Sequence, residues 1–305
     1  MDKLPPTTPL LPFATYVRHH KLRLPAQIVL AATSTIFNPS SLSSYSTPDQ
    51  LMLTELLIVS CLDINKPKLA LRGIQILENT LRTNSGTPDP ESSTRVRRLR
   101  ALYAEGIQSW STATAIYNEL LSENDANLFC MKRKYAIAKA QKKMPLAIKE
   151  LNEYINLQQG DSSAWRELGE VYFLLGDYKS ASFSFEEVVL HHPLDPDCHS
   201  SLADCYFLMG GGNKREASMG GGDAAVAVAL TPSSGKNNLE HLKLARAHYA
   251  KAIDLRPQNS NNKAIIGLEA ASAACLAWYT KFDSKNEFEE DRRLATALLE
   301  FSRNK

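Results

Sequence analysis

The sequence has no run of about 20 apolar residues, which is the length that a helix needs to cross a membrane. Its longest stretch without Asp, Glu, Lys or Arg, residues 24–48, is interrupted by Pro25, Asn38 and Pro39 and has a Ser/Thr-rich second half. We therefore expect no transmembrane helix, and prolines near the start argue against a secretory signal. Residues 3–48 are basic, rich in Ser and Thr and free of acidic residues, which leaves organelle import open as an alternative.

A strong excess of charge and a cysteine framework are also lacking. The formal net charge is +2 over 305 residues, without the basic excess of a dedicated nucleic-acid-binding protein, so we expect no nucleic-acid partner. The five cysteines are odd in number and scattered, which favours reduced thiols over disulfides. Hydrophobic residues make up 44% of the chain and charged residues 22%, so the composition supports a folded core.

Motifs for catalysis, metal binding or cofactor binding are missing as well. Residues 234–236 resemble the end of a phosphate-binding loop, but Leu230 stands at the position of its first glycine and Asn237 replaces the required Ser or Thr. Cys198 and Cys205 lie seven residues apart on one expected helix, a spacing that suits helix packing better than a zinc site. We therefore expect no enzyme activity, no metal and no cofactor.

What the sequence does contain is a repeat of 34 residues. Alanines recur at this spacing as Ala113, Ala147 and Ala181. The residues four positions after them are Tyr117, Leu151 and Phe185. A spacing of four places the small and the large residue on the same face of a helix. The small residue allows a neighbouring helix to approach closely, and the large residue fills the adjacent space.

The clearest copy spans residues 162–195 and resembles the tetratricopeptide repeat, whose pattern of Trp, Leu-Gly, Tyr, Ala, Phe and Pro it matches at the same offsets. The matching residues are Trp165, Leu168, Gly169, Tyr172, Ala181, Phe185 and Pro193. Its one departure is Val188, where the family usually has alanine. The resemblance implies that these residues form the core of a pair of helices.

The same register extends in both directions along the chain. Upstream, Ala70 and Ile74 repeat the small–large pair, and the extra residues before the next copy fit a loop at 83–93. Downstream, the matching residues are offset by 30 positions and are Ala245, Tyr249 and Pro257. A Gly-rich stretch at about 210–238 accounts for the offset, and we expect it to be a flexible insertion. Further helices are expected at 262–279 and 288–302.

These patterns predict an all-α fold, an α-solenoid of about five to six tetratricopeptide-like helix pairs over residues 49–305. A Pro/Ser/Thr-rich, partly helical segment at 1–48 precedes it. Each pair is too small to bury its apolar face alone, so neighbouring pairs must complete the core.

The fifth position of three consecutive copies is basic: Arg98, Lys132 and Arg166. Aromatic residues stand at other positions that usually face the groove of such arrays, namely Phe129, Phe173 and Phe207. Together these six residues predict a partner-binding groove for an acidic segment. A solvated basic face with core aromatics explains the pattern equally well. Residues 95–143 also carry ten Lys or Arg against four Asp or Glu, so contact with anionic lipid is a further alternative.

One known role of this repeat family is disfavoured by residue type. Members that bind chaperone tails clamp a carboxylate with Lys-x3-Asn on one helix and with Asn, Lys and Arg from the next two. Counted from Lys132, the corresponding positions here are Ala136, Glu167, Asp197 and Ser201. The clamp is absent, and Glu167 and Asp197 would repel a carboxylate.

A more specific resemblance lies in three blocks: residues 132–141 (KRKYAIAKAQ), 147–154 (AIKELNEY) and 160–168 (GDSSAWREL). They are similar to the family of subunit 2 of the endoplasmic reticulum (ER) membrane protein complex. The resemblance implies a tetratricopeptide solenoid on the cytosolic side of the ER membrane, held there by protein partners. It further implies contacts with subunits 1, 3, 5 and 8/9 of a complex that inserts tail-anchored and multi-spanning proteins. The Gly-rich stretch departs from the family pattern.

Two functions therefore stand against each other. The resemblance favours a non-catalytic scaffold of that membrane insertase. The alternative is a free cytosolic tetratricopeptide adaptor that binds acidic peptide segments in its concave groove. A scaffold should expose partner-facing apolar surface and be unstable alone, whereas an adaptor should be a stable monomer that binds peptides reversibly.

Overall fold

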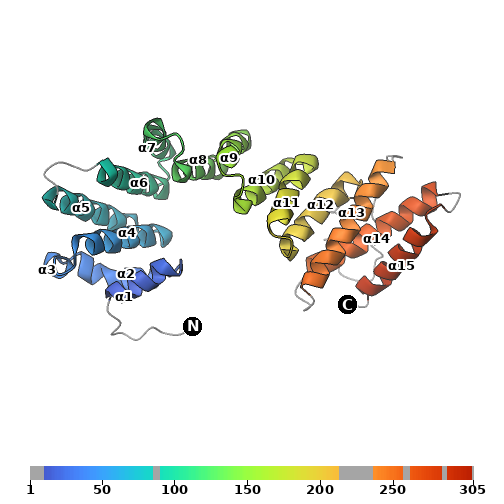
Figure 1. Cartoon of the computed structure of the whole chain (residues 1–305), viewed down its shortest axis with the longest axis horizontal. Coiled ribbons are helices and arrows are strands. Elements are labelled where there is room, and N and C mark those ends of the chain that lie inside the picture. Colours follow the sequence, from blue (N-terminus) through green and yellow to red (C-terminus); the bar gives the residue numbers. More distant parts are fainter. Residues whose placement is uncertain (1–9, 85–89, 213–235, 257–261, 284–286, 304–305) are drawn as a thin grey trace. The chain divides into compact units, whose positions relative to one another are not determined.

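The computed structural model describes residues 10–84, 90–212, 236–256, 262–283 and 287–303, and in these ranges the regular structure is helical throughout. The chain divides into two compact units, Met1–Glu150 and Leu151–Lys305, each of which is described by itself. The expected all-α fold of stacked helix pairs is confirmed (Figure 1). Within the described ranges, no helix is both long and apolar enough to cross a membrane.

The first unit begins with α1 (Leu10–His19), α2 (Pro25–Ile36) and the short α3 (Pro39–Leu42). They pack on α4 (Thr47–Asp63), which pairs with α5 (Pro67–Asn84). Phe13 of α1, Ile28 of α2 and Leu57 of α4 belong to one buried cluster. The Pro/Ser/Thr-rich segment expected at 1–48 thus contributes α1, α2 and α3 to the core that α4 and α5 share.

The unit continues with α6 (Pro90–Gly106), α7 (Trp110–Glu123) and α8 (Leu128–Ala140). Helix α6 begins inside the loop that was expected at 83–93, because proline is tolerated in the first turn of a helix, where its missing N–H has no partner to lose. Helix α9 (Met144–Leu157) contains the boundary between the two units.

The second unit contains α10 (Ser162–Leu175), α11 (Tyr178–His191), α12 (Pro196–Met209), α13 (Lys236–Leu255), α14 (Asn262–Phe282) and α15 (Glu289–Arg303). Consecutive helices pack against one another, and α12 also contacts α14. The insertion expected at 210–238 separates α12 from α13 and lies mostly outside the described residues, as does Pro257. Gly176 ends α10 in the left-handed conformation (φ 80°), which glycine adopts without steric cost.

The small–large pairs that carry the repeat lie in the core. The alanines of the five pairs are fully buried, with 0% of each side chain exposed: Ala70, Ala113, Ala147, Ala181 and Ala245. Their large partners are at most 3% exposed: Ile74, Tyr117, Leu151, Phe185 and Tyr249. Leu168 and Gly169 of the clearest copy are also buried, whereas Trp165 and Tyr172 are half-buried and Pro193 is exposed. The N–H of the Trp165 indole donates to the carbonyl of Gln159 over 2.8 Å.

The crossing of α13 and α14 yields a test of how tightly these helices pack. A Cβ atom at Gly267 would lie 2.3 Å from the ring of Tyr249, which is 1% exposed and has no room to move. Overpacking of this kind costs about 1–3 kcal/mol, which exceeds the gain of about 1 kcal/mol in helix propensity. We expect Gly267→Ala to lower the midpoint of urea unfolding followed by circular dichroism. The control is Gly160→Ala, where a Cβ atom meets nothing within 4 Å; equal midpoints for the two variants would contradict the packing described.

Candidate partner-binding site

The first cation of the expected groove, Arg98 on α6, is engaged by the start of α8. Its Nη2 lies 3.4 Å from Oδ1 of Asn127, and its guanidinium lies over the ring of Phe129 at 5.5 Å. Asn127 is the N-cap of α8, since the same oxygen accepts the N–H of Cys130. Arg98 therefore ties one helix pair to the first turn of the next pair.

Arg166 on α10 makes the equivalent contact in the second unit. It forms an ion pair with Asp195, which is 29 residues further along the chain, the same separation as between Arg98 and Asn127. Asp195 is the N-cap of α12 and accepts the N–H groups of Asp197 at 2.9 Å and Cys198 at 3.2 Å. The fifth-position arginine of a repeat thus recognises the N-cap of the next repeat.

The electrostatics of Asp195 reflect this environment. Burial raises the pKa of its carboxyl group, but hydrogen bonds from Arg166 and from the Cys198 amide outweigh burial and hold the pKa below its usual value. In the folded chain the carboxylate form is therefore favoured, and the ion pair is a structural contact. Lys132, the middle cation of the predicted groove, is half-buried on α8 and also has an interaction partner.

The three aromatic residues of the expected groove occupy different environments. Phe129 is 37% exposed, and its ring meets that of Tyr117 edge to face at 6.3 Å. Phe173 is half-buried against Tyr178, with ring centroids 5.5 Å apart. Phe207, in contrast, is 2% exposed and belongs to the core around α13 and α14. The expectation that Phe207 faces a groove is therefore corrected: both α13 and α14 pack on α12 and cover it.

Two buried acidic residues that the sequence reasoning did not single out link the helix pairs. In the first unit, Glu105 on α6 accepts the hydroxyl of Tyr117 at 2.5 Å and the Nε of Arg133, on α8, at 2.9 Å. In the second, Asp204 on α12 accepts the hydroxyl of Tyr249 and lies 3.0 Å from Nζ of Lys263, on α14. Burial, followed by the neighbouring carboxylate, raises the pKa of both tyrosines. The signal available in the sequence was a tyrosine at the large position of the repeat, where the other copies have Ile, Leu or Phe.

The histidine and cysteine cluster near residue 198 is also explained by packing. The Nε2 of His199 lies 3.0 Å from the carbonyl oxygen of Pro193. The Nδ1 of His199 lies 3.0 Å from Nδ1 of His248. The ring of His248 stacks on that of His199, and burial, followed by the nearby His199, lowers the pKa of His248 to about 4. Cys198 and Cys205 are buried thiols. Among the described residues, no group of three or more His, Cys, Asp or Glu side chains is arranged to hold a metal ion.

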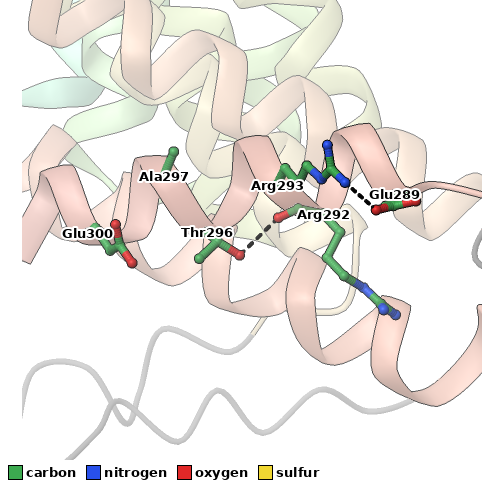
Figure 2. A pocket seen from close by; sticks show the side chains of 6 residues that line it. All are labelled: Glu289, Arg292, Arg293, Thr296, Ala297 and Glu300. Atoms are coloured by element: carbon green, nitrogen blue, oxygen red, sulfur yellow. Dashed lines mark hydrogen bonds and ion pairs between the residues drawn. The ribbon is translucent and has the colours of Figure 1, made fainter.

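A shallow hollow of about 510 Å³ lies along α15, and all of its lining residues come from this one helix (Figure 2). Glu289 and Arg293 form an ion pair there, and the hydroxyl of Thr296 donates to the carbonyl of Arg292. Because one helix supplies every lining residue, this is an open, charged helix surface, and we assign it no ligand.

The helix pairs, their buried alanines and their N-cap contacts define a tetratricopeptide-type array. The C-terminal part of a TPR repeat-containing protein from Cytophaga hutchinsonii has a similar fold, with a TM-score of 0.56 and 16% identity, over 95% of this chain and 93% of that one.

Residues 88–211 match the family model described as the EMC2 TPR-like repeat domain. The chain is 30% identical over 221 residues to ER membrane protein complex subunit 2 of Xenopus tropicalis. The aligned residues make up 72% of this chain and 62% of the relative. The chain is 31% identical over 144 residues to the subunit of the same name in Dictyostelium discoideum, covering 46% of this chain and 41% of the relative. The predicted resemblance to subunit 2 of the ER membrane protein complex is thereby confirmed.

The contact between Arg166 and Asp195 predicts a pH dependence of stability. Because the pKa of Asp195 is lower in the folded chain than in the unfolded one, its carboxylate stabilises the fold above about pH 4, and this contribution disappears as the pH falls through the folded pKa. Asp195→Asn keeps an N-cap but removes the charge, and since the pair is partly exposed we expect a loss of about 1 kcal/mol at neutral pH.

The measurement is urea unfolding of wild type and Asp195→Asn at a series of pH values from neutral to acidic. The difference between the two proteins should shrink as the solution becomes acidic. The control is Asp125→Asn in the exposed turn between α7 and α8. A difference that persists unchanged below the folded pKa of Asp195 would show that the charge of this residue does not stabilise the fold.

Proposed function

We propose that this chain is a non-catalytic scaffold subunit of the ER membrane protein complex. The observation that carries the proposal is the match of residues 88–211 to the EMC2 TPR-like repeat domain, together with an array of helix pairs that is typical of protein–protein interaction. The scaffold acts at the cytosolic face of the ER membrane and is held there through protein partners. By resemblance, these partners are subunits 1, 3, 5 and 8/9, and the assembly inserts tail-anchored and multi-spanning proteins.

An exposed apolar stripe on α11 supports a scaffold role. Phe183 and Leu190 lie seven residues apart on one face of the helix, and Leu194 follows in the turn; they are 55%, 75% and 72% exposed. The ring of Trp165 meets Phe183 edge to face at 5.9 Å and extends the apolar surface. Neighbouring exposed apolar residues of this kind mark protein-interaction surfaces. We assign this stripe to contact with another subunit.

The alternative of a free adaptor for acidic peptides has less support. Arg166 already pairs with Asp195, so an incoming carboxylate would have to displace a carboxylate of the chain itself. The feature that favours an adaptor is Arg98 beside the exposed ring of Phe129. Without the other members of the predicted groove, this pair offers a small contact area.

The proposal is tested by purifying the tagged chain from detergent-solubilised membranes and identifying the co-purifying proteins by mass spectrometry. We expect stoichiometric recovery of membrane-spanning subunits of the complex. The double variant Phe183→Ser, Leu190→Ser should reduce that recovery about tenfold or more, because it removes apolar contact area without touching the core. It should also reduce aggregation of the isolated chain.

A matched control is Leu30→Ser on α2, which removes a side chain that is 85% exposed at a distant place in the sequence. This variant should co-purify as wild type does. Recovery of wild-type chain from the soluble fraction alone, without membrane subunits, would overturn the proposal and favour the adaptor. Unchanged recovery of the double variant would leave the scaffold role intact but remove the α11 stripe from its interface.

A further inference from the structure

A cavity of about 430 Å³ lies within the first unit, outside the predicted groove. Its walls are formed by α7, by the second half of α8, and by the α8–α9 turn with the first turns of α9. The volume falls within the range of about 300–1,000 Å³ that is typical of ligand-binding pockets. The cavity is therefore a second candidate binding site, separate from Arg98 and Phe129.

The interior of this cavity is mostly apolar. Trp110 at the start of α7, Ile137 and Ala138 on α8 and Leu146 on α9 line it. Ala138 and Ile137 are buried, Trp110 is half-buried and Leu146 is 43% exposed, so the apolar lining continues outward to the surface. A bulky apolar side chain that entered the cavity would therefore find apolar side chains from α7, α8 and α9 in its lining.

The charged residues around the cavity leave an excess of positive charge at its rim. Lys134 and Glu150, which both line it, neutralise each other in an ion pair of 3.0 Å and are largely buried, with 19% and 13% of their side chains exposed. Lys143 lines the rim and is exposed, and Lys142 is exposed next to it in the α8–α9 turn. The rim therefore complements a negatively charged group placed beside an apolar one.

The openness of the site decides which class of ligand suits it. Ser111, Ala115 and Asn118 on the α7 wall are exposed, so one side of the cavity faces solvent along the helix. A small molecule needs to bury most of its surface to bind well, which this open wall does not allow. A peptide segment can lie along the wall and bury one or two side chains.

From these features we propose that this cavity is a docking site for an acidic segment of a partner protein, which inserts a bulky apolar side chain between α7, α8 and α9 and places a neighbouring Asp or Glu against Lys143. The proposal goes beyond the scaffold role and does not depend on membership of the ER complex. It also differs from the predicted groove, since none of the six groove residues lines this cavity.

The experiment selects a display library of short random peptides on the full-length chain, with counter-selection against Ala115→Trp. Ala115 is exposed, so the tryptophan fills the mouth of the cavity without entering the core. We expect enriched peptides that combine Leu, Met, Phe or Trp with an adjacent Asp or Glu. The binding of the leading peptide, measured by fluorescence anisotropy, should be at least about tenfold weaker for Ala115→Trp and for Lys143→Glu.

Two variants serve as matched controls. Lys68→Glu on α5 makes the same charge change at an exposed lysine away from the cavity, and Ala126→Trp adds the same ring in the exposed α7–α8 turn. Both should bind the peptide as wild type does, and unchanged thermal unfolding confirms that each variant is folded.

Other results of these experiments would contradict the proposal. Peptides that bind wild type and Ala115→Trp equally, or a selection that enriches no peptide, would overturn the docking site. Enriched peptides without acidic residues, with binding unaffected by Lys143→Glu, would overturn the acidic partner. Blocking of peptide binding by Lys68→Glu as strongly as by Lys143→Glu would show a general charge effect and contradict the site.

Discussion

The helices of this chain pack closely on one another because a fully buried alanine stands where they approach. Every 34 residues the chain places Ala113, Ala147 or Ala181 at a position with no exposed surface, and a large side chain one turn later fills the space beside it. A pair of short helices cannot cover its own apolar face, so burial is complete only when the next pair is in place. Stability and shape are thus properties of the array, and no pair is expected to fold alone.

Polar contacts between successive helix pairs add directional constraints to the apolar packing. Arg98 and Arg166 each reach 29 residues ahead to the N-cap of the next pair, and Glu105 and Asp204 each join a tyrosine and a cation from two other helices. Buried charges of this kind are tolerated because each has a partner. Arg98 and Arg166 of the expected groove already make contacts between helices of the fold. Partner recognition is therefore better sought on other faces, such as the α11 stripe and the cavity between α7, α8 and α9.

The periodic part of this architecture could be predicted from the sequence. A spacing of 34 residues marks one helix pair, and a step of four places two residues on the same face of a helix. The alanines and their large partners illustrate this. The N-cap contacts of Arg98 and Arg166 were missed, although Asn127 and Asp195 each stand 29 residues after these arginines, at equivalent positions of the repeat. The burial of Phe207 was not predictable in the same way, because Phe207 belongs to a core cluster that both α13 and α14 complete. The cavity depends on distances between three helices, which no single-chain pattern reports.

We propose that this chain is a structural member of a membrane assembly, and a cryo-electron microscopy map of the native assembly, purified through this chain, tests the proposal. We expect particles in which a stacked array of helix pairs lies outside the lipid layer, in contact with the non-membrane portions of spanning subunits. Particles that contain the spanning subunits but lack this array, or an array found only in assemblies without membrane subunits, would contradict it.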